Sequence, residues 1–257
     1  MTDPLLSLAV HAAEEAGALL VESFGGPARG VDHKSTPTDL VSDADRDAEE
    51  LILGLLARER PDDGVLAEEG GGRESTSGIT WIVDPLDATV NFLFGIPHWC
   101  VSIAAADADG TIVGVVHNPN LAETFTAKRG EGAHLNRRPI HVGERSDLAG
   151  ALIATGFSYD TAAREEQAVI VAKVLPVVRD IRRAGSAALD LASLATGRVD
   201  GFYEAPLEIW DKAAGVLLVT EAGGMVNELA APLGLTPGVV AANPTLHGEL
   251  RRLVTEP

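Results

Sequence analysis

The sequence feature that most constrains the fold is the stretch 81–92, where an apolar run meets two aspartates and a proline. The apolar start is typical of a buried strand, and Pro85 is expected to end that strand because proline cannot donate to a sheet ladder. Asp87 is suited to cap a helix that begins at Ala88. The pattern therefore predicts that two carboxylates, Asp84 and Asp87, lie where a buried strand gives way to a helix.

These residue types favour a particular chemistry at that junction. A helix N-terminus carries a partial positive charge and unpaired N–H groups, and both suit a phosphate. Carboxylates such as those of Asp84 and Asp87 suit hard divalent cations. A cation pair beside a phosphate site indicates metal-assisted phosphoryl chemistry. The four residues 84–87, taken alone, also fit a turn with a helix cap.

Length and composition indicate a globular protein with a sizeable core. The chain has 257 residues, of which 46% are hydrophobic, enough for one large domain or two interlocked halves. We expect a single domain, 1–257, with an N-terminal α+β half at about 1–145 and a C-terminal α/β half at about 146–257. The division rests on a meander of strands in the first half and on alternating strands and helices in the second.

The charge balance and the N-terminus limit the classes of binding partner and the cellular location that we expect. With 38 acidic against 20 basic residues, the formal net charge is −18, and neither nucleic acid nor an anionic membrane is an expected partner. No apolar stretch reaches the roughly 18 residues of a spanning helix, and the N-terminus lacks the basic region of a secretion signal. Cys100 is the one cysteine, so the expected location is the cytoplasm. The histidines do not fall at zinc-ligand spacing.

Periodicity and turn residues predict the individual elements. In the first half we expect a helix over 5–24, a second helix from about Ser42 in which Asp45 completes an acidic capping box, and strands at 99–106, 112–117, 123–127 and 132–135. In the second half we expect strands at 152–155, 201–204 and 239–244, and helices at 164–175, 187–196, from Trp210, and at 246–253.

A short loop before the central stretch carries two acids followed by glycines. Glu68 and Glu69 follow an apolar pair and precede the glycines at 70–72. A glutamate pair in this setting is usually solvated surface. The glycines favour a mobile loop that could act as a lid.

Two strings resemble signatures of a known family. Residues 84–92, Asp-Pro-Leu-Asp-Ala-Thr-Val-Asn-Phe, resemble the first signature of the inositol monophosphatase family, the lithium-sensitive, magnesium-dependent sugar phosphatases. Residues 210–215, Trp-Asp-Lys-Ala-Ala-Gly, followed by Ala-Gly-Gly at 222–224, resemble the second. Segments 34–49 and 182–188 also match, and the likeness runs from about Leu5 to Leu253. Ala88 departs from the pattern, because the family carries glycine there.

The resemblance implies a fold and a cofactor. The implied fold is α/β (α+β), a layered αβαβα sandwich of the inositol monophosphatase and fructose-1,6-bisphosphatase type, assembled as a homodimer. The implied cofactor is Mg²⁺, two or three ions per site. Sensitivity to lithium is implied in the same way.

The resemblance also implies roles for individual residues. The metal ligands would be Glu68, Asp84, the Leu86 carbonyl, Asp87 and Asp211. The catalytic residues would be Thr89, Asp45 and Glu68. Phosphate would be bound by Ala88, Thr89 and Lys34. The rest of the substrate would be bound by Asp87, Gly185, Ser186, Ala187, Glu204 and Asp211.

Local patterns leave plainer interpretations open beside these roles. Acids at the start of the second helix, Asp45 among them, suit the helix dipole whatever else they do. Asp211 fits a helix N-cap. The small residues at 185–188 fit a helix that packs closely against its neighbours.

The expected function is Mg²⁺-dependent hydrolysis of a small polyol or sugar phosphate by metal-activated water, without a protein nucleophile. Glu204 offers acceptors for sugar hydroxyls, which favours myo-inositol 1-phosphate. Glu208 would tolerate an ammonium group, so histidinol phosphate is an alternative, as is fructose 1,6-bisphosphate on the same site. A regulatory protein with weak or no catalysis is the alternative from another class, and Ala88 permits it. With Ala88 at the phosphate turn, we expect reduced but real activity.

Overall fold

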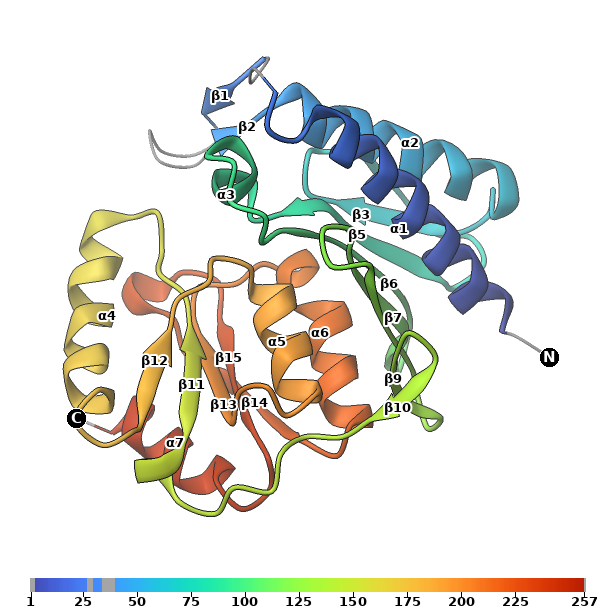
Figure 1. Ribbon diagram of the computed structural model, residues 1–257. Coiled ribbons are helices and arrows are strands. Elements are labelled where there is room, and N and C mark those ends of the chain that lie inside the picture. The colour runs from blue at the N-terminus through green and yellow to red at the C-terminus, as the bar shows by residue number, and fades with distance from the viewer. Residues whose placement is uncertain (1–2, 27–29, 34–39, 257) are drawn as a thin grey trace.

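The computed structural model describes residues 3–26, 30–33 and 40–256, and these residues form five layers (Figure 1). Two helices cover the outer face of an eight-stranded sheet, two more lie between this sheet and a five-stranded sheet, and another two cover the outer face of the second sheet. The predicted layered α/β sandwich is therefore confirmed.

The outer helices of the N-terminal half are α1 (Pro4–Ser23) and α2 (Asp43–Glu59). Asp3 caps α1 by accepting from the Leu5 N–H at 2.8 Å. Ser42 opens α2, and its N–H donates to Asp45 Oδ2 at 2.8 Å, so the predicted capping box is confirmed. Both helices bury one apolar stripe against the sheet below.

The eight-stranded sheet has the order β10-β9-β8-β7-β6-β5-β3-β4. Every neighbouring pair is antiparallel except β3 and β5, which are parallel. The predicted meander is confirmed. Its strands are β3 (Gly64–Ala67), β4 (Gly72–Arg73), β5 (Thr80–Asp87), β6 (Cys100–Asp107), β7 (Gly110–Asn118), β8 (Glu123–Lys128), β9 (Gly132–Leu135) and β10 (Arg138–Ile140). A separate antiparallel pair is formed by β1 (Asp32–His33) and β2 (Leu40–Val41).

The five-stranded sheet has the order β12-β11-β13-β15-β14, in which the first three strands are parallel and the last two antiparallel to their neighbours. Its strands are β11 (Leu152–Thr155), β12 (Asp180–Arg182), β13 (Gly201–Glu204), β14 (Met225–Leu229) and β15 (Gly238–Ala242). The helices of this half are α4 (Thr161–Val174), α5 (Ala187–Ala195), α6 (Ile209–Glu221) and α7 (His247–Thr255), with short 3₁₀ turns at Leu148–Gly150 and Pro232–Gly234.

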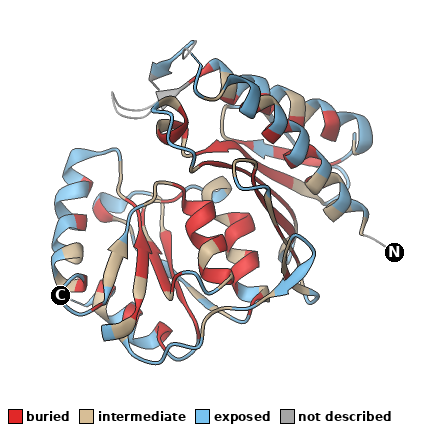
Figure 2. Ribbon diagram, viewed as in Figure 1, coloured by how far each residue is buried: buried red, intermediate tan, exposed pale blue. Residues whose placement is uncertain are grey.

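The middle layer, α5 and α6, is largely buried between the two sheets (Figure 2). Glycines allow α6 to pack closely against the eight-stranded sheet and against α5. A Cβ added at Gly114 of β7 would lie 2.9 Å from the Cα of Ala214 in α6, and one added at Gly215 would lie 2.6 Å from Leu191 Cδ1 in α5. One apolar cluster thus joins the two sheets through these helices.

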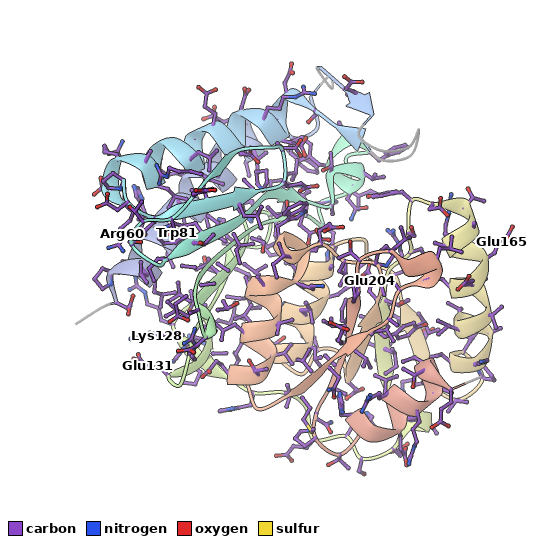
Figure 3. All side chains as sticks on the ribbon, turned by 180° about the vertical axis from the view of Figure 1, so that it is seen from behind. Arg60, Trp81, Lys128, Glu131, Glu165 and Glu204 are labelled. Atoms are coloured by element: carbon purple, nitrogen blue, oxygen red, sulfur yellow. The ribbon has the colours of Figure 1, made fainter. Side chains whose placement is uncertain are left out.

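The strand that leads into the candidate site, β5, is anchored at its far end. Trp81 is fully buried, and its indole N–H donates to Asp63 Oδ2 at 2.9 Å. Asp63 also pairs with Arg60 at 2.7 Å, and Figure 3 labels Arg60 and Trp81 at this end of the sheet. The other end of β5 carries the aspartates.

The prediction that Pro85 ends this strand is wrong. β5 continues through Pro85 to Asp87, but its register against β6 shifts between the Asp84–Ser102 and Asp87–Cys100 pairs. A proline is tolerated at such an irregularity because no ladder N–H is needed there.

The helix α1 also corrects an expectation. By length and composition alone, Pro4–Ser23 could cross a membrane, and it is the one such helix among the described residues. A third of its most apolar window is buried inside the protein, where alanines such as Ala9 and Ala12 belong to the apolar cluster shared with α2 and the sheet. The helix thus buries one face against the eight-stranded sheet and leaves its other face exposed.

Candidate active site

The candidate site is an open cleft of about 380 Å³ between the two halves. It lies where the end of β5 meets the N-terminal ends of α5 and α6. Residues from both halves line it: Glu68, Asp87, Ala88, Phe157, Ser158, Tyr159, Asp160, Arg183, Gly185, Ala187, Glu204, Pro206, Leu207, Glu208, Trp210, Asp211, Leu235 and Thr236.

Asp87 connects the halves, although it does not cap the helix that follows it. Its Oδ2 accepts from Ser186 Oγ at 2.5 Å and from the Ala188 N–H at 2.9 Å, both at the start of α5. The predicted cap on its own helix is therefore wrong. The helix α3 (Thr89–Leu93) begins one residue later than predicted, with Ala88 at the N-cap position and no side-chain cap.

Ala88 adopts the left-handed backbone conformation, with φ 76° and ψ 48°. This region favours glycine because a Cβ crowds the following carbonyl. The glycine of the family signature thus matches the conformation of this turn, and alanine occupies it under strain.

Thr89 and Asp45 lie together, as the resemblance implies. Thr89 Oγ1 donates to Asp45 Oδ1 at 2.8 Å and also lies 3.2 Å from the Leu86 carbonyl. Asp45 is 1% exposed, and its other oxygen accepts from the N–H and Oγ of Ser42. The α2 capping box therefore fixes the carboxylate that orients the Thr89 hydroxyl.

Four carboxyl groups converge at the cleft: Glu68, Asp87 and Asp211 line it, and Asp84 is buried beside them. Asp84 is 1% exposed, accepts from the Leu86 N–H at 3.0 Å and shares a hydrogen bond with the Glu68 carboxyl. Burial, followed by the charges of Glu68 and Asp87, raises the pKa of Asp84 well above its usual range. Burial raises the pKa of Asp87 to about 6, although the hydrogen bonds from Ser186 and the Ala188 N–H lower it.

Asp211 comes from the other half. It is the third residue of α6, and its Oδ2 accepts from the Glu208 N–H at 2.7 Å. The N-cap of α6 is Glu208, so the plainer interpretation of Asp211 as an N-cap is wrong. Burial and the charges of Glu68 and Asp87 raise the pKa of Asp211 well above its usual range.

The chemistry of this donor set fits a hard divalent cation. These carboxyls repel one another, and the raised pKa values of Asp84, Asp87 and Asp211 show that a cation among them would relieve this repulsion. As the described side chains stand, no three of them surround one point ready for a metal ion. The hydrogen bond between Glu68 and Asp84 turns these two carboxyls toward each other.

The predicted substrate residues divide into two groups. Gly185, Ala187 and Glu204 line the cleft. Ser186 does not. It is 1% exposed, it is the N-cap of α5, and its hydroxyl donates to Asp87 and accepts from the Leu189 N–H at 3.1 Å.

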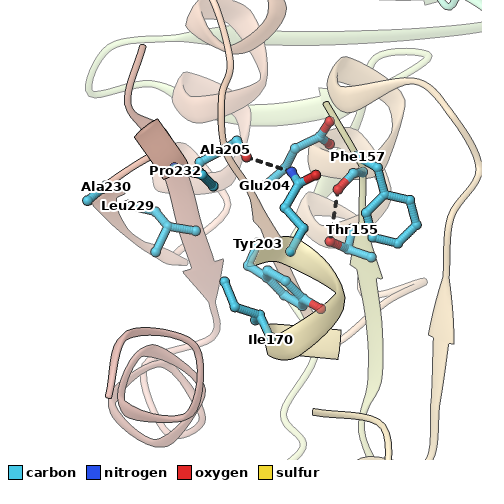
Figure 4. A pocket seen from close by; sticks show the side chains of 11 residues that line it. Thr155, Phe157, Ile170, Tyr203, Glu204, Ala205, Leu229, Ala230 and Pro232 are labelled. Atoms are coloured by element: carbon cyan, nitrogen blue, oxygen red, sulfur yellow. Dashed lines mark hydrogen bonds between the residues drawn. The ribbon is translucent and has the colours of Figure 1, made fainter. Parts of the chain in front are cut away.

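Glu204 stands at the end of β13 that faces the cleft (Figure 3). Burial and the charge of Asp190 raise its pKa to about 8. Gly156 leaves room for this carboxyl, since a Cβ there would lie 2.0 Å from Glu204 Oε1. Behind Glu204 a small enclosed space of about 20 Å³ lies beside Thr155 and Tyr203 (Figure 4).

Four residues near the site escaped sequence reasoning: Glu49, Cys100, Arg183 and Asp190. Arg183 is the one basic residue among the described lining residues, and its guanidinium lies 5.9 Å from the Phe157 ring centre with no ion pair in the described part of the chain. Its place in the matched segment 182–188 could have revealed it. Cys100 Sγ lies 3.8 Å from Asp87 Oδ2, and neither it nor Asp190 has a recognisable pattern.

One predicted site residue cannot be placed. Lys34, the expected phosphate ligand, lies outside the described residues.

Comparison with known proteins adds three relatives. Inositol-1-monophosphatase SuhB of Mycobacterium tuberculosis (strain ATCC 25618 / H37Rv) is 42% identical, over 96% of this chain and 91% of its own. Nus factor SuhB of Escherichia coli (strain K12) is 41% identical, over 94% and 92%. The crystal structure of the extragenic suppressor protein suhB from Bartonella henselae is 39% identical, with a TM-score of 0.92 and coverage of 99% of both chains.

The layered α/β sandwich and its carboxyl-rich cleft, taken with a relative named inositol-1-monophosphatase at 42% identity, place this chain among the phosphatases, as a phosphoric monoester hydrolase. The model of the inositol monophosphatase family matches residues 1–256. The chain belongs to this family, whose members generally depend on metal ions.

Proposed function

We propose that the protein is a Mg²⁺-dependent phosphomonoesterase that hydrolyses a small polyol or sugar phosphate, with myo-inositol 1-phosphate as its main substrate. The observation that carries this proposal is the convergence of four carboxyls from both halves beside the Thr89–Asp45 hydrogen bond. The name inositol-1-monophosphatase of the M. tuberculosis relative supports the choice of substrate.

The carboxylates of Glu68, Asp84, Asp87 and Asp211 and the Leu86 carbonyl would hold two or three Mg²⁺ ions. When bound, such ions would lower the pKa of a bound water and would stabilise the negative charge on the phosphoryl and leaving oxygens.

The protein's own groups then position the reactants. Because Thr89 Oγ1 donates to Asp45, its lone pairs are available to accept from the attacking water, which is aimed at phosphorus. The N–H groups of Ala88 and Thr89, at the start of α3, would bind phosphate oxygens. Lys34 would add positive charge from its own segment.

The substrate contacts follow from the opposite wall of the cleft. With a pKa near 8, the Glu204 carboxyl holds its proton at neutral pH and can both donate to and accept from a sugar hydroxyl. Gly185 and Ala187 leave space for the ring.

Two other phosphate esters remain candidates for the same site. Arg183 favours fructose 1,6-bisphosphate, because its guanidinium has no ion pair with any described residue and suits a second phosphate. Histidinol phosphate gains less support, since Glu208 is engaged by the Thr236 hydroxyl at 2.6 Å.

The test is phosphate release from inositol 1-phosphate, fructose 1,6-bisphosphate and histidinol phosphate, each with Mg²⁺ and with EDTA. Asp84→Asn should lower Mg²⁺-dependent turnover by more than about 100-fold, beyond the loss typical of residues that only support a ligand. Asp109→Asn, the same change in an exposed turn, should leave turnover unaltered. Substantial Mg²⁺-dependent activity in Asp84→Asn would overturn the proposal.

A regulatory role is the second candidate function, supported by the name Nus factor of the E. coli relative. If that role is separate from catalysis, Asp84→Asn should retain it in cells that lack the wild-type protein.

We further propose a cytoplasmic homodimer, for which the exposed side chains of Phe94 (74%) and Ile96 (48%) offer apolar contact area. Light scattering of the purified protein tests the dimer.

A further inference from the structure

Glu49 is a buried carboxylate whose role lies outside the ligand set described above. It belongs to α2 and is 6% exposed. Its Oε2 accepts from the Glu69 N–H at 2.8 Å, and its Oε1 accepts from the Gly71 N–H at 3.0 Å. Two charge-assisted hydrogen bonds to backbone groups offset the cost of burying this carboxylate.

Both N–H groups belong to the loop that carries Glu68. On its other side, the backbone of this loop is tied to the sheet, because the Glu68 N–H donates to the Val83 carbonyl at 3.2 Å. Gly71 is required for the close approach, since a Cβ there would lie 2.8 Å from Glu49 Oε1 and 2.3 Å from Leu53 Cδ1. The glycine-rich loop, expected to be mobile, is therefore held on two sides.

Glu49 lies one helical turn after Asp45, so the two carboxylates share a face of α2. Asp45 holds the Thr89 hydroxyl at 2.8 Å, and Glu49 holds the loop of Glu68. A single helix thus fixes both the hydroxyl that orients water and the backbone that presents a metal ligand.

We propose that Glu49 is a positioning residue: by holding the N–H groups of Glu69 and Gly71, it sets the place of the Glu68 carboxylate before metal binds. The metal in this statement rests on the proposed function. The hold on the loop does not, so the two can fail separately.

The chain offers a matched control for this arrangement. Glu221 of α6 accepts from the Gly130 N–H and the Gly132 N–H, both at 2.8 Å, in a turn that does not line the cleft. It repeats the same bonding between one carboxylate and two alternate N–H groups. Glu50, the exposed neighbour of Glu49, controls for the loss of charge on α2.

The experiment compares Glu49→Gln with Glu221→Gln and Glu50→Gln. A glutamine has one acceptor oxygen, and its NH₂ group would face the second N–H, so the loop should loosen. In metal-free protein we expect faster hydrogen exchange of the amides of Glu69 and Gly71 in Glu49→Gln alone. We expect about tenfold weaker Mg²⁺ binding by calorimetry, the range typical of residues that support a ligand.

The kinetics separate positioning from catalysis. In Glu49→Gln, the Mg²⁺ concentration for half-maximal rate should rise about tenfold, while kcat at saturating Mg²⁺ stays within about twofold, because the ligands themselves are intact. Gly71→Ala, which displaces the loop from the other side, should give the same pattern and serves if Glu49→Gln does not fold.

Three results would overturn the proposal: unchanged Mg²⁺ affinity in folded Glu49→Gln, a fall in kcat with unchanged affinity, or an equal loss of affinity in Glu221→Gln. If Asp84→Asn stays active, the proposed function fails, and the exchange of the Glu69 and Gly71 amides still decides whether Glu49 holds the loop.

Discussion

Ala88 places an ordinary side chain in a backbone conformation that favours glycine, at the turn where phosphate is expected. With φ 76°, it resembles Ala122, which has φ 51° in an exposed turn far along the chain. The left-handed strain is therefore found outside the site as well, but of these two alanines only Ala88 lies at the cleft. Ala88 lines the cleft, and its methyl group also packs against the core beneath α1 and α2.

Ala88→Gly should raise the free energy of unfolding by about 0.5–1 kcal/mol, because relief of the left-handed strain outweighs the added chain entropy and the lost methyl contact. It should also speed turnover, since phosphate can approach the turn more closely. Urea denaturation and phosphate release measure the two effects.

Ala122→Gly is the matched control, and it should gain similar stability with unaltered kinetics. Equal kinetics in Ala88→Gly and wild type would show that the methyl group does not crowd the phosphate.

Asp190 lies on α5, 4% exposed, behind the cleft. Burial and the charge of Asp87 raise its pKa to about 8, although Arg183 opposes the shift. An unfolded chain releases this proton near pH 4, whereas the folded protein keeps it until about pH 8. The contribution of Asp190 to stability is therefore largest below pH 4 and falls as the pH rises through this window.

Asp190→Asn removes that dependence without changing the shape of the side chain much. In EDTA, the free energy of unfolding of the variant should rise by roughly 2 kcal/mol relative to that of wild type as the pH goes from 5 to 8. One pKa unit corresponds to about 1.4 kcal/mol, and structural relaxation around Asp190 reduces the full effect. Urea midpoints at the two pH values measure it, with Asp109→Asn as an exposed control. Parallel pH profiles for Asp190→Asn and wild type would contradict the assignment.

At the residue scale, sequence reasoning succeeded where a motif keeps its partners close and failed where the partner is distant. The Ser42–Asp45 capping box was predictable because both residues lie in one helical turn. Asp87 was assigned to the wrong helix because its donors, Ser186 and Ala188, come from the other half of the chain. No local pattern could indicate that choice.

At the element scale, α6 places Asp211 beside the aspartates of β5. It does so by lying almost in contact with the backbone of β7 at Gly114, where a Cβ would meet the Cα and carbonyl of Ala214 at 2.9 and 3.1 Å. Backbone atoms cannot rotate aside, so the distance between this helix and the sheet depends on the missing side chain.

Gly114→Ala should lower the free energy of unfolding by about 1–3 kcal/mol, the cost of overpacking, and should reduce turnover because α6 and Asp211 shift away from β5. Thermal unfolding and phosphate release measure the two losses. Gly248→Ala, in α7 with open space around it, is the matched change and should be neutral or stabilising by up to about 1 kcal/mol. A wild-type rate in Gly114→Ala would mean that α6 has freedom to adjust.

Elements were more predictable than their irregularities. The boundaries of β11 and β13 agree with the expected ranges, because their apolar runs are short and bounded by turns. The passage of β5 through Pro85 was not predictable, because the register shift that tolerates proline depends on the pairing partner, β6.

At the scale of the whole molecule, the candidate ligands are divided between the two halves. Glu68, Asp84 and Asp87 belong to the eight-stranded sheet and its loops, and Asp211 belongs to α6. One apolar cluster joins both sheets through α5 and α6, so the halves should unfold together.

Calorimetry should therefore show a single transition whose midpoint rises with Mg²⁺. At ten times the dissociation constant, the gain is about 1.4 kcal/mol, or roughly 3–6 °C for a chain of this size. Asp84→Asn should abolish the rise. Two separate transitions, or an equal rise in Asp84→Asn, would contradict a site shared by both halves.

The charge of the cleft also determines the order in which the cation and the phosphate ester bind. Among the residues that the structure describes, six acidic residues line the cleft against one basic residue, Arg183, and the protein as a whole carries a net charge of −18. A phosphate ester that approaches this surface is repelled until the cleft has acquired positive charge. We therefore expect compulsory ordered kinetics, in which the cation joins first and the ester second, and in which inorganic phosphate becomes a stronger inhibitor as the Mg²⁺ concentration rises.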